Sequence, residues 1–243
     1  MSISQPIHSH TTGLELSPDD KTPMADSFGL EFTFLSRQQS FSYKFQHILK
    51  RALDILGAGI GLILISPLLL FIAVLIKLTS PGPVFYKSKR LGKSYQPFYM
   101  LKFRTMIPEA DAERAKLRKQ ANLEGNLFKL KNDPRITGIG KILRAFSLDE
   151  FPQLLNVLRG EMSLVGPRPL PPDESRLFQE PYTLRFQLYP GMTGQWQVMG
   201  RSNSSFKELC KLEMDYVLGW SFGRDLKILI KTLPAVLSSH GAY

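Results

Sequence analysis

Hydrophobic positions are unevenly spread along the 243-residue chain, and one uninterrupted run stands out. From Ile55 to Ile76 the chain has 22 residues without a charged side chain, enough for about 33 Å of straight helix. The alternative, a buried helix in a soluble core, would need apolar neighbours on every face. The run therefore predicts a helix that inserts into a membrane.

Ser66 and Pro67 lie in the middle of this run. Proline lacks a backbone donor and clashes with the preceding turn, so we expect a break or a sharp bend here, with Ser66 or another helix satisfying the freed backbone groups. Both flanks are basic, with Lys44, Lys50 and Arg51 before the run and Lys77, Lys87, Lys89, Arg90 and Lys93 after it. Since positive flanks favour the cytoplasmic side, we expect a re-entrant helix over 44–80. A kinked spanning helix is the alternative.

The segment before the membrane run lacks a hydrophobic period. It is rich in Ser, Thr and Pro, and residues 1–40 carry a net charge of −3 against +13 for the remainder. Such a composition predicts a mobile acidic tail over 1–43. The segment lacks the basic start and apolar stretch of a secretory signal.

The part from 81 to 243 predicts a small, helix-rich α/β body. Short β-prone runs occur at 84–86 and 98–101, and loops dominate 166–173 and 190–204. Helices are expected over 108–121, 139–146, 151–158 and about 205–218. The apolar stretch 226–237 is interrupted by two lysines and a proline, which suits either an amphipathic interfacial helix or a helix packed on the core.

Composition narrows the partner and the chemistry. The formal charge of +10 and pI near 9.7 point to an anionic partner, which could be nucleic acid, anionic lipid or a phosphorylated substrate. One cysteine excludes an internal disulfide framework. The sequence contains no P-loop, dinucleotide fingerprint or zinc spacing, and its four histidines are peripheral, which argues against a Ser-His triad.

The strongest local candidate for chemistry is Ser147-Leu148-Asp149-Glu150. Adjacent carboxylates can bind a divalent cation and supply a nucleophile, whereas Ser147 and Glu150 also fit a capping box at a helix start. Several cations lie elsewhere in the sequence, namely Lys102, Arg104, Arg144 and Arg168. Carboxylates, a metal and several cations together would make a phosphoryl-transfer site.

Several strings in this order resemble the monotopic phosphoglycosyl transferases, also called bacterial sugar transferases or polyprenyl-phosphate hexose-1-phosphate transferases. They are KRALD at 50–54, Ser66-Pro67, SPGPVF at 80–85, KFRTM at 102–106, SLDE at 147–150 with PQLLNV at 152–157, GEMSLVGPRP at 160–169 and PGMTGQWQV at 190–198. Larger members carry additional N-terminal membrane helices, so the chain resembles the catalytic-core form.

The resemblance implies an activity and a cofactor. Such enzymes transfer a sugar-1-phosphate from a UDP-sugar to undecaprenyl phosphate, with Mg²⁺, and release UMP. Asp149 would form a covalent phosphosugar intermediate, and Glu150 would assist with the metal or with proton handling. The ending of the chain and residues 196–201 resemble the exopolysaccharide and O-antigen branch, which favours glucose or galactose.

The resemblance also implies binding residues and a location. Phosphate and nucleotide-sugar contacts would come from Lys102, Arg104, Arg144, Arg168, Arg201 and Asp215. The membrane or lipid would be met by Lys50, Arg51, Asp54, Ser66 and Pro67. The expected partners are UDP-hexose, undecaprenyl phosphate and the lipids of the bacterial inner membrane, with the catalytic domain 81–243 on its cytoplasmic face and no nucleic acid bound. A flat interfacial enzyme could also pair sideways as a homodimer.

Two other functions remain open. A non-enzymatic membrane-associated scaffold explains the apolar run and the basic charge but gives no reason for Asp149 and Glu150 beside arginines. A basic nucleic-acid-binding protein leaves the apolar run unexplained.

Overall fold

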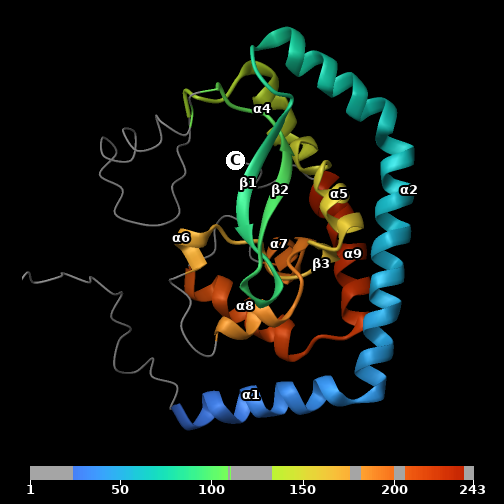
Figure 1. Cartoon of the computed structure of the whole chain (residues 1–243), viewed down its shortest axis with the longest axis vertical. Coiled ribbons are helices and arrows are strands. Elements are labelled where there is room, and N and C mark those ends of the chain that lie inside the picture. Colours follow the sequence, from blue (N-terminus) through green and yellow to red (C-terminus); the bar gives the residue numbers. More distant parts are fainter. Residues whose placement is uncertain (1–23, 109, 111–132, 176–181, 200–205, 238–243) are drawn as a thin grey trace, which may run out of the picture.

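The computed structural model describes residues 24–108, 110, 133–175, 182–199 and 206–237 (Figure 1). Its helices are α1 (Met24–Gln39), α2 (Phe41–Thr79), α4 (Gly138–Ala145), α5 (Gln153–Arg159), α6 (Pro172–Ser175), α7 (Gln195–Met199), α8 (Phe206–Leu218) and α9 (Phe222–Leu237). Its strands are β1 (Phe85–Leu91), β2 (Pro97–Phe103), β3 (Ser163–Val165) and β4 (Gly191–Thr193). Short 3-10 turns are η2 (Lys93–Tyr95), η3 (Leu148–Glu150) and η4 (Tyr182–Gln187). The helix-rich α/β prediction is confirmed.

Helix α2 follows one side of the molecule and changes direction towards its end (Figure 1). It remains helical through Pro67, so the helix is not broken there, and of the two expected outcomes the structure has the bend in one continuous helix (Figure 1). An N–H at position 67 would have bonded the carbonyl of Ile63, and the hydroxyl of Ser66 donates to that oxygen at 2.9 Å. The expectation that Ser66 satisfies a freed backbone group is confirmed.

Both halves of α2 pack against the same body. In the first half, Ala58 is fully buried in a cluster with Met100 of β2 and Val157 of α5. In the second half, Ile72 and Ile76 pack with two further body residues, Phe103 and Leu143. The opposite face of α2 exposes large apolar side chains at Ile55, Leu56, Ile60, Ile63, Leu64, Leu68, Leu70, Phe71, Val74 and Leu78.

Two small sheets support the body. Strands β1 and β2 form an antiparallel hairpin whose register runs from Phe85 opposite Phe103 to Leu91 opposite Pro97, which confirms and lengthens the predicted strands. Strands β3 and β4 pair in parallel over two positions. Both β4 and α7 fall in the region 190–204, where a loop was predicted, because pairing with a distant segment is invisible to local propensity.

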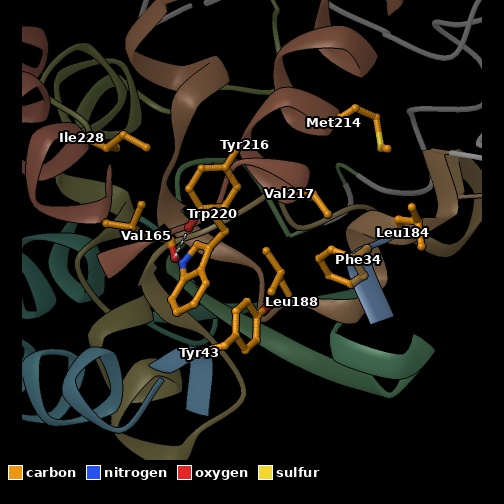
Figure 2. Packing of buried hydrophobic residues seen from close by; sticks show 10 residues of the cluster. All are labelled: Phe34, Tyr43, Val165, Leu184, Leu188, Met214, Tyr216, Val217, Trp220 and Ile228. Atoms are coloured by element: carbon orange, nitrogen blue, oxygen red, sulfur yellow. Dashed lines mark hydrogen bonds between the residues drawn. The ribbon is translucent and has the colours of Figure 1, made fainter. Parts of the chain in front are cut away.

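Residues Met24–Gln39 form helix α1 in place of the irregular segment expected over this part of 1–43. The side chain of Phe34 is only 3% exposed and packs near Leu184 and Leu188 (Figure 2). Arg37 donates to the carbonyl of Leu218 at 2.8 Å. The burial of one aromatic side chain therefore attaches this polar segment to the body. A single residue hardly alters the composition of the segment, so a prediction from composition does not detect it. Residues 1–23 lie outside the described part of the chain.

The remaining helix predictions have mixed outcomes. Helices α4, α5 and α8 confirm the segments expected at 139–146, 151–158 and about 205–218. Most of the helix expected over 108–121 lies outside the described residues. Helix α9 runs alongside α2 (Figure 1). Ile228 is buried in the core, which confirms the alternative of a helix packed on the core, while Ile230 is 69% exposed. The interfacial alternative stays a prediction.

Candidate active site

The two adjacent carboxylates lie in the short turn η3, between α4 and α5. The turn begins at Ser147, whose φ of 55° is left-handed, a conformation uncommon for a residue other than glycine. Ser147 makes no side-chain capping bond, so the capping-box alternative is wrong. Leu148 packs on the cluster of Ile72 and Ile76, which fixes the turn against the second half of α2.

Asp149 and Glu150 share one cation. Lys102 of β2 lies 2.6 Å from a Glu150 carboxylate oxygen and 3.9 Å from an Asp149 oxygen. Asp149 is buried, and this desolvation raises its pKa despite the opposing charge of Lys102. Burial also opposes ionisation of Glu150, but the charge and hydrogen bond of Lys102 outweigh it and lower the pKa of Glu150. The pair therefore consists of a desolvated carboxyl and a firmly ionised one.

The hairpin adds a cation that is not among the site residues predicted from sequence. Opposite residues in an antiparallel pair share a face, so Arg90, opposite Phe98, lies on the same face as Lys102, opposite Tyr86. The guanidinium of Arg90 donates to the Pro169 carbonyl at 3.2 Å, and its charge contributes to the lowered pKa of Glu150. The two-residue alternation of the predicted hairpin could have identified Arg90.

Arg144 is directed by a contact between α4 and the segment after β2. Its Nε donates to the hydroxyl of Thr105 at 2.9 Å, and its charge reaches Asp149. Helix α4 lies very close to this segment, since a Cβ on Gly140 would stand 2.1 Å from the Thr105 carbonyl oxygen. Thr137 caps the helix by accepting from the Gly140 amide at 3.0 Å. Glycine at 140 is thus required for the position of Arg144.

Arg168 is held by its backbone and leaves its guanidinium over an aromatic ring. Its amide donates to Glu213 of α8 at 2.8 Å, and its guanidinium lies 5.0 Å from the ring centroid of Trp196. The charge of Arg168 also lowers the pKa of Glu150. Sequence reasoning missed Glu213, which is 3% exposed and forms an ion pair with Arg185 at 2.8 Å.

The structure directs Arg104 away from the carboxylates. Its guanidinium donates to the carbonyls of Ser80, at 2.9 Å, and of Pro81, in the turn that joins α2 to β1. Gly82 in this turn has a φ of 110°, and a Cβ there would meet the Arg104 guanidinium at 2.5 Å. Arg104 therefore ties the end of α2 to the body.

One further sequence-predicted residue is not brought to the carboxylates. Asp215 of α8 forms an ion pair with Arg224 and accepts a hydrogen bond from Gln195. Arg201 lies outside the described residues.

The charged residues at the start of α2 are engaged by the body. Lys50 contacts Asp225 and the Val165 carbonyl, at 2.6 and 2.8 Å. Arg51 donates to the carbonyls of Val157 and Leu158, the end of α5, at 2.7 and 2.9 Å. Asp54 accepts from the Ser163 hydroxyl and the Leu164 amide, at 3.0 and 2.9 Å. Ser66 and Pro67 lie exposed at the middle of α2.

Among the described residues, no group of three or more His, Cys, Asp or Glu side chains could hold a metal ion. Asp149 and Glu150 nevertheless converge on Lys102 and are oxygen donors. Mg²⁺ is commonly bound by one or two carboxylates together with substrate phosphates. The two carboxylates therefore fit a magnesium ion that is completed by a phosphorylated substrate.

The sequence model of bacterial sugar transferases matches residues 45–239. Exopolysaccharide production protein ExoY of Rhizobium meliloti is 44% identical over 198 residues, 80% of this chain and 88% of the relative. The UDP-glucose:undecaprenyl-phosphate glucose-1-phosphate transferase of Caulobacter vibrioides is 42% identical over 202 residues, 80% of this chain and 72% of the relative. The undecaprenyl-phosphate galactose phosphotransferase of Salmonella typhimurium is 38% identical over 228 residues, 91% of this chain and 47% of the relative.

Proposed function

Because the chain belongs to the bacterial sugar transferase family, we propose that it moves a hexose-1-phosphate from a UDP-hexose to undecaprenyl phosphate and releases UMP. The chain is an enzyme of the class that transfers a sugar phosphate to a lipid carrier in polysaccharide synthesis. The names of two relatives support glucose or galactose as the hexose. Beyond this class of enzyme, we propose the UDP-hexose donor, the covalent intermediate and the release of UMP.

Asp149 is the nucleophile of the proposed reaction. A carboxylate oxygen of Asp149 attacks the sugar-proximal phosphorus, the bond from that phosphorus to the bridging oxygen breaks, and UMP leaves with the electron pair. A phosphate oxygen of undecaprenyl phosphate then attacks the same phosphorus and regenerates the Asp149 carboxylate. Burial supports this role because a desolvated carboxylate has few water molecules to shed before attack.

Lys102 favours the reactive, ionised form of Asp149. Burial would keep Asp149 protonated, and the positive charge of Lys102 counteracts this effect by lowering the pKa of Asp149. The negative charge of Glu150 raises that pKa by repulsion. The ionised Glu150 in turn fixes the Lys102 ammonium through the 2.6 Å contact. Lys102 therefore orients the two carboxylates. Its ammonium can bind a substrate phosphate only if it breaks its contacts with them or keeps them while also contacting the phosphate.

Mg²⁺ would be held by Asp149 and Glu150 and would neutralise phosphate charge when bound. The residues that we propose for the phosphates themselves are Arg144 and Arg168, joined by Arg90. Arg144 is fixed through its Nε, which leaves the planar end of the guanidinium for a phosphate. Arg168 is fixed through its backbone and its ring contact. Rigid cations of this kind suit a diphosphate donor.

We propose that α2 is re-entrant in the bacterial inner membrane and that the body lies on the cytoplasmic face. The observation in favour is that both halves of α2 pack on one body, Ala58 from the first and Ile76 from the second. A straight spanning helix would carry its two ends to opposite sides of the bilayer and could not make both contacts. Pro67 lies inside α2, and the change of direction of this helix permits the return (Figure 1).

The observation that carries the proposal is the desolvated Asp149 beside ionised Glu150 and Lys102, with the charge of Arg144 acting on Asp149 and that of Arg168 on Glu150. We would measure UMP release by detergent-purified protein with undecaprenyl phosphate, Mg²⁺ and a panel of UDP-sugars led by glucose and galactose. Release with one sugar, lost on chelation and in Asp149→Asn, is expected. Glu208→Gln, at an exposed acidic position of α8, is the matched control and should retain activity.

Silence across the panel, with folded protein verified, would contradict the proposal and favour the membrane-associated scaffold. Normal release by Asp149→Asn would contradict the assignment of the nucleophile while leaving the enzyme class intact.

A further inference from the structure

The start of α2 presents an apolar face well before the uncharged run. Phe41 is 84% exposed, Phe45 51% and Ile48 66%. These residues follow one another at spacings of four and three, so they share one face of the helix, and Ala52 and Ile55 continue it. The exposed stripe of the membrane segment therefore extends without interruption back to Phe41.

None of the charged side chains in this stretch lies on the exposed apolar stripe. Lys50 and Asp54 are 7% and 4% exposed and point into the body. Arg51 is bound by the α5 carbonyls. Lys44 is exposed beside the stripe, where a long ammonium side chain can reach lipid phosphates from an apolar surface. In sequence these charges end the apolar run, but in the fold they do not interrupt its outer face.

We propose that the lipid-contacting face of α2 begins at Phe41, and that Phe41 to Asp54 lies along a bilayer with this face inserted among the acyl chains. This adds 14 residues, about 21 Å of helix, to the membrane surface. The occupant is lipid because the face continues directly into an apolar window of mean hydropathy 2.8 that is only 11% buried. Because the two stretches form one continuous face of a single helix, we expect both of them to contact lipid. The inference does not depend on the phosphoryl-transfer reaction.

The chain is well suited to a site-specific test. Its only cysteine, Cys210, is buried, and burial raises the pKa of the thiol to about 12, so added cysteines will be labelled selectively. We would label Phe45→Cys and Ile48→Cys of the full chain with an environment-sensitive fluorophore. The labelled proteins are reconstituted in phosphatidylcholine vesicles, and quenching by brominated lipid is compared with quenching by aqueous iodide.

Ile63→Cys, in the uncharged run, is the lipid-exposed reference, and Asp173→Cys, in α6 on the side away from α2, is the aqueous one (Figure 1). We expect positions 45 and 48 to follow Ile63→Cys, with strong quenching by brominated lipid and weak quenching by iodide. Iodide quenching equal to that of Asp173→Cys would overturn the proposal. Protection from both quenchers, with cross-linking between copies, would also overturn it, because a second chain would then cover the face.

A charge substitution gives an independent measurement. Phe45→Asp should lower partition into phosphatidylcholine vesicles by about tenfold, the effect of removing one aromatic side chain from an apolar contact. Thr33→Asp, at an exposed polar position of α1, is the matched control and should leave partition unchanged. UMP release in detergent should be the same in both variants. Unchanged partition of Phe45→Asp would contradict the proposal even if enzymatic activity were absent throughout.

Discussion

Two groups of charged residues lie close to α2, and they differ in how completely contacts within the protein satisfy their charges. At the start of α2, Lys50 contacts Asp225, which also accepts from Tyr216 and Trp220, at 2.7 and 3.2 Å. The protein itself thus holds the ammonium and its carboxylate in a closed, buried network. At η3, by contrast, the ion-pair contact of the Asp149 carboxylate is a longer one, 3.9 Å to a Lys102 ammonium that also binds Glu150.

Buried charge alone therefore does not identify a reaction site. A satisfied network stabilises the position of α2, because breaking it would leave a charge without a partner in a poorly solvated place. By contrast, a carboxylate that is only partly satisfied, and that lies beside cations held in place, can still interact with a substrate. The two groups therefore make opposite predictions for activity and stability.

The largest expected effect is on activity, at Asp149. Asp149→Asn should lower the rate of UMP release by at least about a thousandfold, because the amide cannot form the phosphosugar bond. Its thermal midpoint should change by no more than about 4 °C, since burial already disfavours the ionised form. Activity assays and thermal unfolding on the same preparation check both parts. A large loss of stability would place Asp149 in the same class as Lys50.

The next effect is on stability, at Lys50. Lys50→Met should destabilise the protein by about 3–5 kcal/mol, because Asp225 then lacks its ammonium partner. The double variant Lys50→Met with Asp225→Leu should recover part of the loss. Denaturant unfolding in detergent measures both, with exposed Arg159→Ala of α5 as the control. A stable Lys50→Met protein that binds lipid phosphate poorly would instead support a role in substrate binding.

A smaller effect concerns the pH dependence of activity. The charge of Lys102 lowers the pKa of Asp149, so Lys102→Gln should raise that pKa further. Because attack requires the ionised carboxylate, activity disappears as the pH falls through this pKa. The acid limb of the rate profile should therefore move to higher pH in Lys102→Gln and stay in place in Lys89→Gln, an exposed position of β1. An unmoved limb in Lys102→Gln would separate Lys102 from the nucleophile.

The smallest effect is expected at Asp215, whose side chain is 60% exposed in its ion pair with Arg224. Exposed pairs contribute little, so Asp215→Asn should change the free energy of unfolding by about 0.5 kcal/mol or less. Its kcat/KM for the UDP-sugar should stay within about twofold of the parent. A tenfold loss of kcat/KM would return Asp215 to the donor site that the sequence resemblance implies.

Much of the fold was accessible from sequence where the signal is local. The long uncharged run predicts α2, and the β-prone runs at 84–86 and 98–101 predict the two strands of the hairpin. Docking of α1 was not accessible, because it depends on one buried aromatic, Phe34, that meets residues far away in sequence. The parallel pair β3–β4 was missed for the same reason.

The candidate site shows the same limit at the level of single side chains. Arg104 and Arg144 are chemically alike, but one binds backbone carbonyls at a turn and the other is directed by Thr105 towards Asp149. Glu213 and Asp215 are two positions apart on α8, which places them on different faces, and only Glu213 is buried. Sequence supplies the residue types, whereas tertiary contacts decide which of them remain available.

The most direct test of the central claim, that Asp149 forms a phosphosugar intermediate, is isotope exchange without the lipid acceptor. The purified protein is incubated with Mg²⁺, an unlabelled UDP-hexose that it uses and radiolabelled UMP, and label in the UDP-hexose is measured. A two-step reaction through Asp149 predicts exchange in the absence of undecaprenyl phosphate and none in Asp149→Asn. Turnover with lipid but no exchange without it would contradict the account and indicate direct transfer between the two substrates.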